Sequence, residues 1–253
     1  MKLLANEFYL AFAELRRHYW EPVFGVAVVS GLFLGLYFGV RALAQGRLSV
    51  AAGDLDGLLL GYVSWGVAGA AYNSVARHVT QESQTGTLEQ LYLSPHRFSS
   101  ILICRTVVHM TSGLCSAAAL AVIAMVGTGR WLHVPLWHVV TLLLLSSVSL
   151  IGVGLAIGGV VLLQKRLSAA AAVLNILLLV FVSVPAFPWN AAAALPFSYG
   201  ASAVRAIAAG RAEPSLALYV VVAANSAVWL VLGVVSWSAL EHRARSTNAL
   251  GQH

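Results

Sequence analysis

Long runs of apolar residues, each nearly devoid of charge, constrain this chain more than any other feature. Residues 23–40 form the first of these runs and contain no charged side chain. A helix needs about 20 predominantly apolar residues to cross the hydrocarbon core of a bilayer. Across the chain 59% of the residues are hydrophobic and 9% are charged, whereas roughly 25% of the residues in a soluble domain are charged. The sequence therefore predicts an all-α integral membrane protein.

The apolar runs predict six transmembrane helices within a single domain that covers residues 1–253. We place these spans at residues 23–40, 57–76, 99–126, 137–163, 168–184 and 215–240. Lysine and arginine are more frequent at the span ends on the side that holds both termini, and the positive-inside rule makes that side cytoplasmic. Because the chain is rich in alanine, glycine and valine, which suggests a bacterial genome, we expect a multi-pass protein of the bacterial inner membrane.

Three segments between or before the spans are too polar or too broken to cross a membrane. Residues 3–20 place an apolar stripe and a polar face on one helix, which is typical of a helix that lies in the membrane interface. We expect a polar loop at residues 42–56. Residues 185–212 are interrupted by prolines, and we expect one or two short helices there that re-enter the membrane from the outer side.

Several classes of function are disfavoured by residues that the sequence lacks. No phosphate-binding glycine-rich loop occurs, and the only lysines are Lys2 and Lys165. The two cysteines, Cys104 and Cys115, do not have the spacing of a metal or redox site. The basic residues form no patch that would suit nucleic acid, and no span carries the acidic residue expected of an ion-coupled transporter. We therefore expect no cofactor, metal or enzymatic activity on this chain itself.

The polar residues within the spans are uncharged and have two open interpretations. They could line a transport pathway or form hydrogen bonds between helices. The candidates are Tyr62, Trp65, Tyr72, Asn73, Asn175 and Asn225. A lining of aromatic and amide groups without charge suits a hydrophobic or amphipathic cargo better than a small ion.

Glycines repeat along two of the predicted spans. Gly31, Gly35 and Gly39 recur at every fourth residue, which leaves a bare groove on one helix face where another helix can approach closely. The groove could serve a contact between subunits or packing within one chain. Glycines also cluster in the fourth span, at Gly152, Gly154, Gly158 and Gly159, where we expect helix packing.

Residues 80–95 form a polar segment between two apolar runs. Leu88, Leu91 and Tyr92 fall on one stripe of a helix, whereas Glu89 turns away from it. Pro95 disfavours the helical conformation for the residue before it and ends the helix. A short amphipathic helix beneath a membrane bundle is a suitable docking element for a cytosolic partner.

This segment resembles the cytoplasmic loop of the ABC-2 family of ABC transporter permeases. The family pattern is matched in order and spacing by Glu82, Gly86, Thr87, Leu88, Glu89, Leu91, Ser94 and Pro95. Ser83 and Gln84 depart from it, because the pattern has arginine and glutamate at these positions. The order of the other predicted segments also agrees with the family, so the resemblance covers essentially the whole chain.

The resemblance implies an ATP-driven exporter assembled from several chains. Two permease chains, identical or sister subunits, would form the pathway, and two cytosolic ATPase subunits would bind ATP and Mg²⁺. The family's coupling helix would lie at about residues 85–93 and dock on the ATPase. The docking residues it implies are Glu82, Thr85, Gly86, Thr87, Leu88, Glu89, Leu91, Tyr92, Ser94 and Pro95. A drug, a lipid or a glycolipid would be the cargo. The alternative is a membrane-embedded enzyme or assembly scaffold whose cytoplasmic loop docks a partner.

Overall fold

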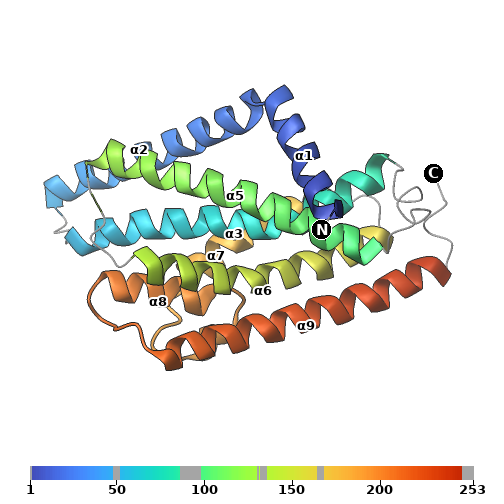
Figure 1. Ribbon diagram of the computed structural model, residues 1–253. Helices are drawn as coiled ribbons and strands as arrows, with labels where there is room; N and C mark the ends of the chain where they lie inside the picture. The colour runs from blue at the N-terminus through green and yellow to red at the C-terminus, as the bar shows by residue number, and fades with distance from the viewer. Residues whose placement is uncertain are drawn as a thin grey trace.

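The computed structural model describes residues 2–47, 52–85, 98–129, 131, 136–163 and 168–246, and they form a bundle of helices (Figure 1). The described residues contain no strand, so the prediction of an all-α protein is confirmed. The elements are α1 (Lys2–Arg17), α2 (Trp20–Arg47), α3 (Ala52–Thr85), α5 (Phe98–Thr128), α6 (Leu136–Leu163), α7 (Ser168–Ser183), η1 (Ala191–Ala194), α8 (Ser198–Ala208) and α9 (Leu216–Ser246).

Four of the described helices are long and apolar enough to cross a membrane. The candidate spans are Pro22–Ala42, Cys104–Thr128, Leu136–Val160 and Leu216–Arg243. The protein is therefore a multi-pass membrane protein. The predicted second and fifth spans correspond to α3 and α7. Glycines and polar aromatic residues lower the hydropathy of α3, and the described part of α7 has only 16 residues.

The predicted polar loop at residues 42–56 is mostly helical. Helix α2 continues to Arg47 and α3 begins at Ala52. Alanine, leucine, glutamine and arginine favour a helix at the end of α2. The helices therefore extend beyond the apolar runs that predicted them.

Helix α3 occupies the centre of the bundle, where it packs against α5, α6, α7 and α8. The side chains of Ala68, Ala71 and Tyr72 on α3 are buried in the same cluster as Leu142 and Leu150 on α6. The surrounding helices separate much of α3 from the bilayer. A helix in this position needs less hydropathy than one that faces lipid, which explains how a polar helix can lie inside a membrane bundle.

The tightest helix pair is α6 with α9, and glycine makes it possible. A Cβ atom at Gly152 would lie 2.6 Å from the carbonyl carbon of Trp229, and one at Gly233 would lie 2.6 Å from the carbonyl carbon of Gly152. Further along the pair, a Cβ atom at Gly159 would lie 2.8 Å from a methyl group of Leu240. The prediction that Gly152 and Gly159 serve helix packing is confirmed.

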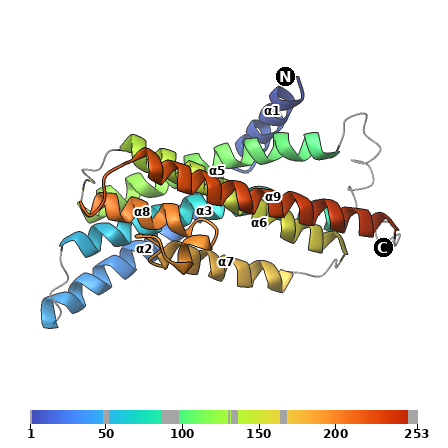
Figure 2. The same ribbon diagram turned by 90° about the horizontal axis from the view of Figure 1, so that it is seen from below.

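Helices α1 and α2 lie at the side of the bundle. Helix α1 ends at Arg17, and α2 begins at Trp20 with Pro22 in its first turn, where proline is well accommodated. Figure 2 shows α1 turned away from the direction of α5 and α9. Helix α2 packs mainly against α5, through a small cluster that contains Phe33 and Tyr37. Most of its remaining surface is uncovered.

Candidate functional site

The segment predicted to dock a partner follows directly from the central helix. Helix α3 runs to Thr85, so Glu82 and Thr85 lie in its last turns. The cytoplasmic position of residues 80–95 stays a prediction. Residues 80–85 contain neither glycine nor proline, and Gly86 is the first residue that favours a helix end. The other predicted docking residues, Gly86, Thr87, Leu88, Glu89, Leu91, Tyr92, Ser94 and Pro95, lie outside the described residues, and so do the side chains of Glu82 and Thr85.

Different helix ends lie at the two ends of the bundle. The end of α3, the start of α5 and the end of α9 lie at one end, close to α1, whereas α8 lies at the opposite end (Figure 1). The C-terminal end of α3 and the N-terminal end of α5, which flank the predicted docking segment, therefore lie at the same end of the bundle as the end of α9. The short elements η1 and α8 fall within residues 185–212, and re-entry of this segment into the membrane stays a prediction.

Arg205 of α8 holds the C-terminal end of α7. Its guanidinium donates hydrogen bonds to the carbonyl oxygens of Val182, Ser183 (3.4 Å) and Val184 (3.2 Å). The last carbonyls of a helix have no partner within the helix, and a cation is favourable at this end. Burial lowers the pKa of the Arg205 guanidinium, because desolvation penalises its charged form. The arginine is therefore a structural clamp between α7 and α8.

Side-chain hydrogen bonds also order the chain between α7 and α9. The Ser202 hydroxyl accepts hydrogen bonds from the backbone N–H groups of Ala186 (3.1 Å) and Phe187 (2.9 Å). The Asn225 amide donates to the carbonyl of Ala193 (2.9 Å), and the Trp229 indole donates to the carbonyl of Ala194 (2.9 Å). The structure thus gives Asn225 a hydrogen-bond partner, as one of its two interpretations expected. The partner lies in a short helix and not in a neighbouring span.

Two of the proposed pathway residues are buried within the bundle of this one chain. The ring of Tyr62 stacks on Phe33 with the ring centroids 4.1 Å apart, and its hydroxyl lies 3.4 Å from the Ser30 hydroxyl. Tyr72 is also buried, and its hydroxyl has no hydrogen-bond partner among the described residues. Both side chains would line a pathway only if it ran through the interior of a single bundle.

The remaining proposed pathway residues lie in less enclosed places. Trp65 is half-buried between the two apolar clusters of the bundle. The Asn73 amide donates to the carbonyl of Gly69 (2.8 Å) on its own helix. The side chain of Asn175 lies outside the described residues. A pathway role for these six residues stays a prediction.

The glycines of α2 lie on a face that no other described helix covers. Gly31, Gly35 and Gly39 are exposed, and a Cβ atom at any of them would have no described neighbour within 4 Å. Leu32 and Leu36 on the same helix are 71% and 60% exposed. Packing within the described part of the chain therefore does not account for these glycines, and a contact between subunits stays a prediction.

An ion pair that the sequence analysis missed joins α1 to α5. A carboxylate oxygen of Glu7 lies 3.4 Å from Nε of Arg105, and both side chains are largely buried. Arg105 lies at the start of an apolar span, and Glu7 lies on the polar face of α1. The only hint of this pair in the sequence was a charged residue at each of these two places. Helix periodicity relates residues that are close in the chain and cannot pair two that are so far apart.

Apolar helices packed through glycines around a more polar central helix define a multi-pass membrane protein. The sequence profile of the ABC-2 type transporter family matches residues 8–208. The chain belongs to this family, as its resemblance predicted, and is a permease component of a transporter. Membership implies association with an ABC ATPase. Comparisons with curated proteins and with solved structures gave no match.

Proposed function

We propose that this chain is the membrane subunit of an ATP-driven exporter, with six spans, both termini in the cytoplasm and a location in the bacterial inner membrane. Two cytosolic ATPase subunits bind ATP and Mg²⁺ and dock on a coupling helix at residues 85–93 of each permease chain. Family membership and the absence of a phosphate-binding loop from the sequence support this division of labour.

The continuity of α3 is the observation that carries the proposal. This helix packs against five other helices and runs without a break to Thr85, where the proposed coupling helix begins. A displacement of the docking segment by the ATPase acts directly on the helix at the centre of the bundle. ATP-dependent closure of the ATPase pair then shifts the equilibrium between two states of the bundle, because each state makes different contacts with the ATPase.

The interior of the bundle favours a hydrophobic or amphipathic cargo. Among the described residues, the fully buried polar side chains are tyrosine, serine and threonine, and the charged side chains of Glu7, Arg105 and Arg205 are only partly buried. A cargo with a fixed charge would find no counterion among the fully buried residues. A drug, a lipid or a glycolipid is compatible with such an interior.

A second permease chain completes the pathway in our proposal and contacts the glycine face of α2. The uncovered Gly31, Gly35 and Gly39 allow a second helix to approach the α2 backbone closely, as small residues do in membrane helix pairs. The exposed Leu32 and Leu36 border this face. The second chain is either a copy of this one or a sister subunit.

The docking helix can be tested by placing charge on its apolar stripe. The double variant Leu88→Asp, Leu91→Asp should lose its partner ATPase in co-purification, because two carboxylates cannot enter an apolar groove without a large desolvation cost. The variant Gln90→Asp places a carboxylate on the opposite side and should retain the ATPase. Both variants should elute from a sizing column as the wild type does. Recovery of the ATPase at full yield with the double variant would show that this helix is not the docking element.

A further inference from the structure

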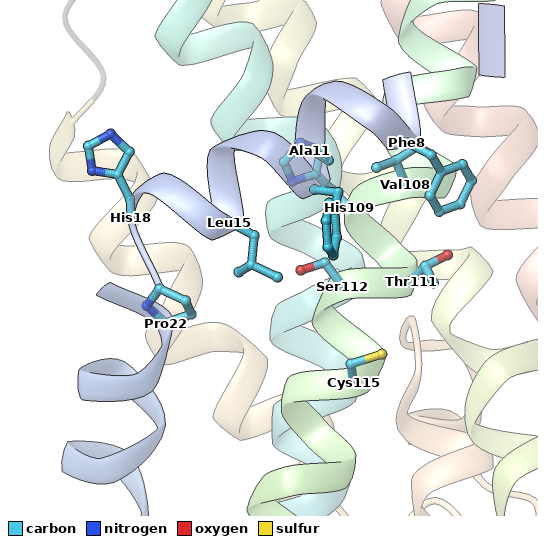
Figure 3. A pocket seen from close by; sticks show the side chains of 11 residues that line it. Phe8, Ala11, Leu15, His18, Pro22, Val108, His109, Thr111, Ser112 and Cys115 are labelled. Carbon is cyan, nitrogen blue, oxygen red and sulfur yellow. The ribbon is translucent and has the colours of Figure 1, made fainter. Parts of the chain in front are cut away.

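An open groove of about 500 Å³ lies between α1 and α5 (Figure 3). Phe8, Phe12 and Leu15 of α1 line one side, and Ser112 and Cys115 of α5 line the other. The start of α2, at Pro22, borders the groove as well. Its volume is within the range of about 300–1,000 Å³ found for small-molecule sites.

The surface of the groove is predominantly apolar. Phe8, Phe12 and Leu15 are all partly exposed, so the described residues leave much of this side of α1 uncovered. On α5, the Thr111 hydroxyl that borders the groove donates to the carbonyl of Val107 (2.8 Å) in its own helix. This hydroxyl is therefore satisfied within its own helix, and the apolar side chains that make up most of the lining favour an apolar occupant.

The position along α5 places this groove within the hydrocarbon layer. The candidate span of α5 begins at Cys104, and Val108 and Cys115 lie further into it. At a rise of 1.5 Å per residue, these two positions are about 6 and 16 Å along the helix from Cys104. Lipid acyl chains are the apolar molecules available at this depth, and an empty groove would forfeit their dispersion contacts.

Basic side chains lie near one end of the groove. Arg16 and Arg17 occupy the last turn of α1 and are exposed, and His18, which follows them, lines the groove. Basic side chains at a membrane surface attract lipid phosphates. Near the other end of α1, the ion pair of Glu7 with Arg105 ties the helix to α5 and keeps the groove in place.

We propose that this groove binds a phospholipid, with an acyl chain between α1 and α5 and its phosphate beside Arg16 and Arg17. The lipid belongs to the subunit and is separate from the transported cargo. The proposal depends on the membrane location of α5 and on the groove, and it holds whether or not the transport proposal is correct.

Photolabelling of the full chain in lipid vesicles tests the proposal. The vesicles contain phosphatidylcholine and phosphatidylglycerol with a trace of phosphatidylglycerol that carries a diazirine in its acyl chain. After irradiation, mass spectrometry maps the lipid adducts. We expect adducts to concentrate in residues 8–15 and 108–115. Adducts spread evenly over the outward faces of α5, α6 and α9 would mean general lipid contact only and would overturn the proposal.

A matched pair of variants on one face of α5 tests occupancy. Ser112→Phe fills the groove and should lower its adduct yield at least about tenfold, equivalent to roughly 1.4 kcal/mol. Ala119→Phe adds the same ring two turns further along, where the side chain is exposed and outside the groove, and should leave the yield unchanged. Equal yields in the two variants would contradict the site. The wild-type adduct map decides the question even if Ser112→Phe does not fold.

Two further measurements examine the headgroup and the rival occupant. Replacing Arg16 and Arg17 by glutamine should reduce labelling by phosphatidylglycerol, and unchanged labelling would overturn the headgroup assignment.

A second copy of the chain is the other apolar molecule that could cover the groove. In a Cys104→Ser background, oxidation should give no dimer through Cys115, and a disulfide-linked dimer would assign the groove to a protein contact instead.

Discussion

The close approach of α6 and α9 predicts that a single methyl group at Gly152 destabilises the bundle. In Gly152→Ala the new Cβ atom would lie 2.6 Å from the carbonyl carbon of Trp229 and 2.8 Å from Cα of Leu230. Ordinary contacts between carbon atoms are about 3.5–4.0 Å, so the helices must separate by about 1 Å. The neighbouring atoms belong to the backbone and cannot rotate away. Overpacking of this kind costs about 1–3 kcal/mol.

The control for this variant is another glycine within a helix. Alanine is favoured over glycine in a helix by about 1 kcal/mol, and this gain offsets part of the clash. Gly25 of α2 has no described neighbour within 4 Å of a built Cβ atom, so Gly25→Ala has the same gain without the clash. The difference between the two variants therefore isolates the overpacking cost of about 1–3 kcal/mol.

Thermal unfolding in detergent measures this difference. For chains of 150–250 residues, 1 kcal/mol corresponds to about 2–4 °C, so Gly152→Ala should melt roughly 2–12 °C below Gly25→Ala. Gly233→Ala should behave in the same way, because its Cβ atom would meet the backbone of Gly152. The double variant at Gly152 and Gly233 should lose less than the sum, since one separation of the helices relieves both clashes. If Gly152→Ala melted at or above Gly25→Ala, the packing of α6 on α9 would be incorrect.

Three further predictions concern the outer segment and the glycine face. Arg205→Gln should lower the melting temperature, because hydrogen bonds to a charged group contribute about 1.5–3 kcal/mol each. Arg205→Lys should recover only part of the loss, because lysine lacks the planar set of donors of the guanidinium. An equal loss in Arg211→Gln, which changes an exposed arginine, would argue against the clamp. Ser202→Ala should cost about 1–3 kcal/mol, since two backbone N–H groups lose their acceptor, and a wild-type melting curve would contradict this. Gly35→Leu should reduce the dimer fraction on native gels by steric exclusion, whereas Gly25→Leu should not; an unchanged dimer fraction would show that the glycine face does not contact the partner chain.

A large part of the fold could be predicted from the sequence because membrane helices can be recognised from their apolar composition. The helices observed at Phe98–Thr128, Leu136–Leu163 and Leu216–Ser246 lie close to the predicted spans. Helix ends were less predictable, as the continuation of α3 to Thr85 illustrates. The apolar run ends earlier, but the polar residues after it also favour a helix, so hydropathy alone cannot locate the end.

The candidate site also has a part that could be predicted from the sequence and a part that could not. The pattern in residues 80–95 identified the family from local sequence, and the family profile confirmed it. The Glu7–Arg105 pair and the Arg205 clamp could not be predicted, because each joins residues far apart in the chain. Asn225 was recognised as a polar residue within a predicted span, but its partner on η1 depends on how that short helix folds back.

The sequence by itself determined that this is a helical membrane protein of the ABC-2 family, since water excludes long apolar runs and the family pattern is read from consecutive residues. Only the tertiary structure decided which helix is central and which glycines are packed. Gly152 and Gly31 lie in equally apolar helices, yet one contacts a neighbouring backbone and the other faces outward. In a bilayer, lipid and protein are equally apolar, so hydropathy does not select the neighbour of a helix; close steric fit between surfaces does.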